Sequence, residues 1–108
     1  MANEGQGTWH RVAAAGDVRD NEPKQVKISG RLIGLFRVDG EVHAIDDICT
    51  HEFAILSEGY QDGDTIECPL HQALFHIPTG EARSDPAEEN VRRYSVKVEG
   101  DEIFVLLD

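Results

Sequence analysis

Cysteine, aromatic residues, basic residues and long apolar runs are all scarce in this sequence. Two cysteines among 108 residues allow at most one disulfide, which excludes a disulfide-stapled secreted scaffold. No stretch approaches the ~18 apolar residues of a membrane-spanning helix. The N-terminal residues also lack the basic and apolar pattern of a signal peptide. We therefore expect a cytoplasmic protein that is not inserted in a membrane.

The charge is strongly one-sided. Ten Lys and Arg residues oppose 21 Asp and Glu residues, so the formal net charge is -11. Such a chain repels nucleic-acid phosphates and anionic lipid surfaces, and we expect neither as a partner. The charge either keeps the protein soluble or steers it toward a partner with a basic patch. A chain of this length forms one domain, which we expect to be a monomer in solution.

Apolar residues recur with a period of two rather than 3.6, which predicts strands and not amphipathic helices. Asp39-Gly40 predicts a type I′ hairpin turn. Helices are plausible only for residues 12–18 and 86–90. Several short strands with frequent turns favour an antiparallel sandwich or barrel. The predicted strands are residues 25–29, 31–38, 41–45, 65–68, 74–77, 92–98 and 102–107.

The middle of the chain interrupts this alternation with two Cys/His pairs. They are Cys49-Thr50-His51 and Cys68-Pro69-Leu70-His71, and sixteen residues separate His51 from Cys68. Each pair offers one thiolate and one imidazole, so two loops can bring four nitrogen and sulfur ligands to one centre.

Three interpretations of these four residues compete. The cysteines can be small core residues beside incidental histidines. The set can be a structural Cys₂His₂ zinc site, although such sites usually pair Cys with Cys and His with His. The third is a Rieske [2Fe–2S] centre, in which two Cys bind one iron and two His bind the other. The spacing suits the third best.

The chain resembles the Rieske-type ferredoxins, small electron carriers of bacterial aromatic-ring-hydroxylating dioxygenase systems. The resemblance covers nearly the whole chain and includes both Cys/His pairs. By this resemblance, Cys49 and Cys68 hold the inner iron, while His51 and His71 hold the outer one. Further matches are Ser57-Glu58-Gly59, the segment from His71 through Phe75 to Thr79-Gly80, a proline-bearing loop at Asp85-Pro86-Ala87, and the closing hairpin.

The resemblance implies an all-β, Rieske-like fold. An antiparallel basal sandwich or barrel, residues 1–45 and 81–108, would carry an inserted cluster-binding subdomain, residues 46–80. The function implied is one-electron transfer, not enzymatic catalysis, in the breakdown of aromatic hydrocarbons. Electrons would pass from an NAD(P)H-dependent, flavin-containing ferredoxin reductase to a terminal oxygenase. The chain is too short to hold that oxygenase's mononuclear iron domain. The alternatives are the small subunit of an assimilatory nitrite reductase and a zinc module.

The remaining histidines and the single tryptophan have no ligand spacing. We interpret His10, His43 and His76 as surface or packing residues. Trp9, on an expected first strand, is predicted to be a core residue. Phe53, Ile55 and Leu56 follow the first Cys/His pair and are expected to cover the centre.

Acidic residues flank the first Cys/His pair. Asp46 and Asp47 are predicted to form a solvated patch and not an acid/base pair. With Glu52 and Glu58 they are candidates for a docking surface that attracts a basic partner.

The second Cys/His segment lacks two hydroxyl groups. The respiratory-chain relatives carry a Ser and a Tyr, two and four residues after the second ligand His, whose hydroxyls hydrogen-bond the cluster and a ligand sulfur. Here these positions are Ala73 and Phe75. The relatives' bracing disulfide is also absent, because its positions are Ala54 and Leu70. These differences predict a reduction potential near the low end of the Rieske range.

Overall fold

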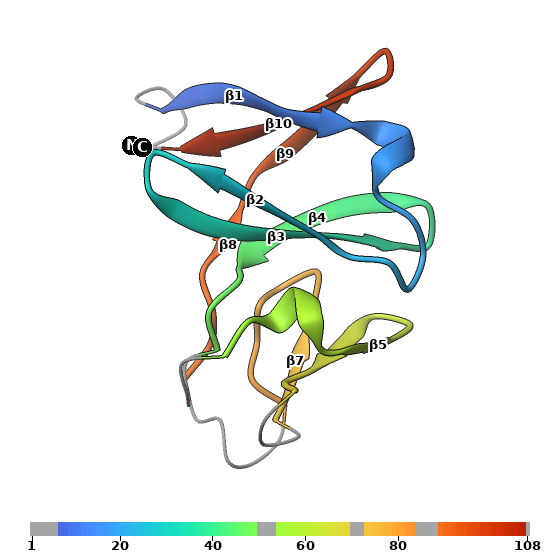
Figure 1. Cartoon of the computed structure of the whole chain (residues 1–108), viewed down its shortest axis with the longest axis vertical. Coiled ribbons are helices and arrows are strands. Elements are labelled where there is room, and N and C mark those ends of the chain that lie inside the picture. Colours follow the sequence, from blue (N-terminus) through green and yellow to red (C-terminus); the bar gives the residue numbers. More distant parts are fainter. Residues whose placement is uncertain (1–6, 50–53, 70–72, 84–88, 108) are drawn as a thin grey trace.

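The computed structural model describes residues 7–49, 54–69, 73–83 and 89–107, and within them the fold is all-β (Figure 1). Ten strands and two 3₁₀ turns are present in these ranges. No helix in this part of the chain has the length and apolar character to cross a membrane. The elements are β1 (Thr8–Ala14), η2 (Ala15–Asp17), β2 (Lys24–Ile28), β3 (Arg31–Val38), β4 (Glu41–Asp46), η3 (Leu56–Glu58), β5 (Tyr60–Asp62), β6 (Thr65–Glu67), β7 (Leu74–His76), β8 (Arg93–Tyr94), β9 (Val96–Glu99) and β10 (Glu102–Leu107).

The strands form three antiparallel sheets, with orders β1-β10-β9, β2-β3-β4-β8 and β5-β6-β7. The predicted strands are all found, with small shifts at their ends, except that residues 92–98 divide into β8 and β9 at Ser95. The sequence analysis missed β5. A helix over residues 12–18 is wrong, because Val12 and Ala13 belong to β1, where Ala13 pairs with Ile103 of β10. The second predicted helix falls mostly outside the described residues.

The four-stranded sheet lies between two hydrophobic cores. Ile33 and Leu35 of β3 face the core shared with the β1-β10-β9 sheet. Phe36 and Val38 of the same strand face the core shared with the β5-β6-β7 sheet. Figure 1 shows this central position. Because both faces of β3 are covered, the strand is apolar at nearly every position from Leu32 to Val38 and does not alternate.

The predicted hairpin turn between β3 and β4 is present. Asp39 and Gly40 have φ angles of 51° and 83°, and a type I′ turn requires positive φ at both central residues. Val38 and Glu41 pair directly across this turn.

The prediction that Trp9 is a core residue is wrong. Its exposed fraction is 38%, and the Lys97 ammonium lies 4.5 Å from the centre of its ring. Trp9 pairs with Leu106, so it lies on the face of the sheet opposite to Ile103 and Val105, which fill the core. In an outer sheet only one face meets the core, and the period-two pattern alone does not say which.

Candidate functional site

The two cysteines lie in the same hydrophobic core. Cys49 and Cys68 have exposed fractions of 3% and 1%, and neither forms a disulfide. They are far apart in the sequence but pack into the core between the central sheet and the β5-β6-β7 sheet. Two thiols are therefore held in an apolar environment, where sulfur ligands are protected from water.

Each cysteine opens a short loop that is closed in the same way. The Cys49 N–H donates to the Ala54 carbonyl at 2.9 Å, and the Cys68 N–H donates to the Ala73 carbonyl at 2.8 Å. We call residues 49–54 the first ligand loop and residues 68–73 the second. His51 and His71 belong to these loops and lie outside the described residues.

Antiparallel pairing supports both loops from below. Below the first ligand loop, Ile48 pairs with Ile55, and the Leu56 N–H donates to the Asp47 carbonyl at 2.7 Å. The second ligand loop is the tip of the β6–β7 hairpin, beyond the pair Glu67 and Leu74. Each cysteine is thus at the end of a short antiparallel ladder, which holds its backbone in place.

The residues around the cysteines are apolar and tightly buried. Leu56, which was expected to cover the centre, is fully buried in this core, and Ile55 is half-buried. Phe53 lies outside the described residues. Ala73 and Phe75, the two positions that lack hydroxyls, are also fully buried here.

These observations test whether a Rieske cluster fits. The group needs two thiolates held away from water and two imidazoles on separate loops. The structure supplies two buried cysteines in one core, each opening a loop whose sequence contains one histidine. The donor set and its dry surroundings fit the group.

Asp47 is not part of a solvated acidic patch, and that prediction is wrong. Its side chain has no exposed surface, and it accepts hydrogen bonds from the Ser57 N–H at 2.7 Å, the Ser57 hydroxyl at 2.6 Å and the Gln25 amide at 2.8 Å. Burial raises the pKa of the Asp47 carboxyl, and the hydrogen bonds from Ser57 and Gln25 oppose that rise. No pattern in the sequence separates this aspartate from Asp46.

Asp46 is half-buried and also has a structural partner. Its carboxylate accepts a hydrogen bond from the Tyr94 hydroxyl, which in turn accepts one from Arg31 at 3.1 Å. Of the four predicted docking residues, Glu58 is exposed as expected, and Glu52 lies outside the described residues.

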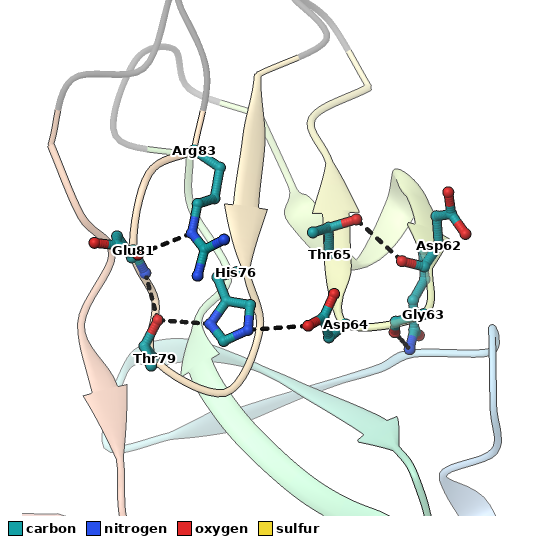
Figure 2. A network of polar contacts seen from close by, with 9 residues as sticks. Asp62, Gly63, Asp64, Thr65, His76, Thr79, Glu81 and Arg83 are labelled. Atoms are coloured by element: carbon teal, nitrogen blue, oxygen red, sulfur yellow. Dashed lines mark hydrogen bonds and ion pairs between the residues drawn. The ribbon is translucent and has the colours of Figure 1, made fainter.

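The other histidines occupy packing positions, as predicted. Figure 2 shows the His76 ring between Asp64 and Thr79, at the end of the β6–β7 hairpin away from the second ligand loop. Its Nε2 donates to the Asp64 carboxylate at 3.1 Å, and its Nδ1 lies 2.8 Å from the Thr79 hydroxyl. His43 and His10 are half-buried on β4 and β1, and burial lowers the pKa of His43.

An all-β chain with two buried cysteines, each opening a histidine-bearing loop, has the fold and the donor set of a small metal-binding protein. The family model of the Rieske [2Fe-2S] domain matches residues 8–95. The chain therefore belongs to the Rieske [2Fe-2S] domain family. This membership implies a Rieske cluster as the cofactor and removes the zinc alternative.

Known proteins narrow the class further. The ferredoxin component of the naphthalene 1,2-dioxygenase system of Pseudomonas putida is 37% identical over 97 residues, covering 90% of this chain and 93% of its own length. The Sphingomonas yanoikuyae B1 ferredoxin superimposes with a TM-score of 0.90 at 35% identity, covering 94% of this chain and all of its own. A ferredoxin solved in complex with the oxygenase of carbazole 1,9a-dioxygenase has a TM-score of 0.85 at 37% identity, covering 90% of this chain and 91% of its own. The chain is thus a ferredoxin component of an aromatic-ring dioxygenase system, an electron carrier and not an enzyme by itself.

Proposed function

We propose that this ferredoxin takes single electrons from an NAD(P)H-dependent, flavin-containing reductase and delivers them to a terminal aromatic-ring-hydroxylating oxygenase. The observation that carries the proposal is the pair of buried cysteines, each at the start of a ladder-supported loop that contains one histidine. Two of the relatives described above are named as parts of dioxygenase systems, which favours this role over that of a nitrite reductase subunit.

We assign the cluster ligands as Cys49 and Cys68 for the inner iron and His51 and His71 for the outer iron. When bound, the cluster accepts and releases one electron. The chain's own residues favour a nearly constant geometry during this change, because the two ends of each ligand loop are joined by a backbone hydrogen bond and both cysteines lie in a packed core. A carrier of this kind needs little rearrangement between its redox states.

We also propose a division of labour within the chain. Residues 46–80 form the cluster-binding subdomain, and residues 1–45 and 81–108 form the base that carries it. The separate core around Cys49 and Cys68 supports this division, and the shared strand β3 supports a rigid connection between the two parts. We place the protein in the cytoplasm, where the nicotinamide reductant is available.

The function is tested first by composition. We expect the purified protein to contain about two iron and two acid-labile sulfide per chain and no stoichiometric zinc, since a Rieske cluster has this composition. Elemental analysis and sulfide assay measure it. One zinc and no sulfide per chain would contradict both the ligand assignment and the electron-carrier role.

The assignment of His71 as a ligand is tested separately by EPR spectroscopy of two histidine variants. Replacing His71 with cysteine puts a thiolate in place of an imidazole and removes the ligand asymmetry of the cluster. The EPR spectrum of the reduced variant should therefore move away from the mixed-ligand type. Replacing His43, a packing histidine on β4, with cysteine should leave the spectrum unchanged.

A further prediction concerns the rate at which the ferredoxin associates with the oxygenase. Glu58 is exposed in η3, directly before the β5-β6-β7 sheet that carries the second ligand loop. We expect the second-order rate of electron transfer to the oxygenase to fall as salt rises, because the Debye length shrinks to about 8 Å at physiological ionic strength. Stopped-flow kinetics measure this rate.

A matched pair of variants locates the effect. Glu58→Gln, beside the sheet that carries the second ligand loop, should weaken the salt dependence. Asp101→Asn, in the β9–β10 turn of another sheet, should leave it unchanged. A rate that is flat or rises with salt in the parent protein would show that apolar contacts and not acidic ones guide docking.

A further inference from the structure

Asp47 is the one charged side chain that is completely buried in the described part of the chain. It lies two residues before Cys49, at the base of the first ligand loop. Burying a carboxylate costs free energy of folding unless strong hydrogen bonds offset that cost. The burial of Asp47 therefore calls for a physical explanation.

The hydrogen bonds of Asp47 hold together the two ends of the segment that contains the first ligand loop. Its backbone carbonyl accepts from the Leu56 N–H, and its side-chain oxygens accept from the N–H and hydroxyl of Ser57. A third donor, the Gln25 amide, reaches it from β2. The carboxylate thus joins the strand entering the loop, the turn leaving it and the central sheet.

The donors around Asp47 favour one charge state of its carboxyl. The Ser57 N–H and the Gln25 amide nitrogen can only donate, and the Ser57 hydroxyl is placed to donate as well. Burial raises the pKa of the Asp47 carboxyl, and these three hydrogen bonds act against that rise because they stabilise the ionised form.

No cation is paired with the Asp47 carboxylate in the part of the chain that the structure describes. Within the described residues, no Lys, Arg or His bonds to Asp47, and the charged neighbour that acts on it is the acidic Glu58. Gly34 closes the other side so tightly that a Cβ there would lie 2.7 Å from the Asp47 Oδ1. Among the described residues, Asp47 is therefore a fully buried carboxylate without an ion-pair partner, two residues before Cys49.

We infer that Asp47 is a positioning residue of the first ligand loop, and that its buried negative charge lowers the reduction potential of the centre bound at Cys49. The inference rests on the proposed function, because it requires the cluster. Reduction adds one electron to that centre, and a nearby fixed negative charge opposes the added charge. In a buried site this repulsion is poorly screened by water or salt.

The first test is Asp47→Asn, which keeps the shape and removes the charge. We expect the reduction equilibrium to shift threefold to tenfold toward the reduced form, which is about 30–60 mV at about 59 mV per tenfold for one electron. Protein-film voltammetry gives the potential. The visible absorption spectrum and the iron and sulfide content show whether the cluster is intact.

A second pair of variants leaves the buried residue in place. Gln25 on β2 is an exposed residue whose amide reaches the Asp47 carboxylate. Gln25→Lys therefore brings an ammonium group to the carboxylate without opening the core. It should raise the potential in the same direction as Asp47→Asn. Gln25→Met, a neutral side chain of similar length, removes the same hydrogen bond without adding charge and should not raise it.

The outcomes separate the two proposals. A parent protein without iron and sulfide would refute the electron-carrier role. An intact cluster whose potential is unchanged in Asp47→Asn and in Gln25→Lys would refute the role of Asp47 alone. If Asp47→Asn does not fold, the comparison of Gln25→Lys with Gln25→Met decides, and equal potentials in these two variants would overturn the inference.

Discussion

Gly59→Ala is expected to destabilise the protein severely and to release its cluster. A Cβ at Gly59 would overlap the backbone carbonyl oxygen of Glu67, the residue directly before Cys68. A backbone oxygen cannot turn aside as a flexible side chain can, so the strand that carries Cys68 must shift. Such overpacking costs about 3 kcal/mol, and each kcal/mol lowers the Tm of a domain of this size by roughly 4–8 °C.

Circular dichroism and the visible absorption of the cluster measure the two effects during heating. Gly16→Ala is the matched control, because its Cβ meets no atom within 4 Å and its φ is not positive. We expect the control to melt with the parent protein. A Gly59→Ala variant that melts with the parent and keeps its cluster would show that the β5–β6 contact is far softer than the structure indicates.

A low reduction potential is the second large effect that we expect. The Rieske range runs from about -150 to about +300 mV, and the unmodified protein should lie near its lower end. Ala73 and Phe75 occupy the positions where hydroxyl donors raise the potential of the respiratory-chain relatives. Both are fully buried in the core that contains Cys49 and Cys68, so water cannot supply the missing hydrogen bonds there. Protein-film voltammetry of the parent protein tests this value.

Restoring the hydroxyls should raise the potential. Ala73→Ser and Phe75→Tyr each add one donor, and about 1 kcal/mol of preference for the reduced form corresponds to roughly 40 mV. Ala54→Ser, at the matching position of the first ligand loop, is a control for the added polarity alone. A parent potential well above zero would show that another feature dominates, and the uncompensated charge of Asp47 makes that outcome still less expected.

The cofactor was predicted correctly from the sequence, because the two Cys/His pairs narrow the possible centres and the resemblance to the Rieske-type ferredoxins selects one of them. Two Cys/His pairs at this spacing offer a donor set that few centres accept, and neighbouring residues on one short loop stay neighbours in any fold. The hairpins could also be predicted from the sequence, because a tight turn depends on the residues within it. Asp39 and Gly40 determine a turn whatever surrounds it, and the strands on either side follow from their period of two.

The packing of the three sheets into layers could not be predicted from the sequence. Strand β3 is apolar on both faces, which a sequence pattern does not distinguish from other buried segments. Only the tertiary structure shows that Ile33 and Leu35 face one core while Phe36 and Val38 face another. The short strand β5 has no clear pattern of its own and exists because it pairs with β6.

The sequence by itself thus predicted the cofactor, the all-β class and the main hairpins, which depend on residue chemistry and on contacts between near neighbours, and it is the basis of the proposed ligand set. The tertiary structure decided which face of each element is buried. Asp46 and Asp47 are identical in sequence terms, yet only Asp47 is enclosed, because Ser57, Gln25 and Gly34 converge on it from three separate segments. Trp9 lies on the face of β1 opposite to the core residues Ile103 and Val105, and among the described residues its ring contacts Lys97 of the same sheet. Whether a side chain is buried depends on which distant segments pack against it, and a local sequence pattern does not specify those segments.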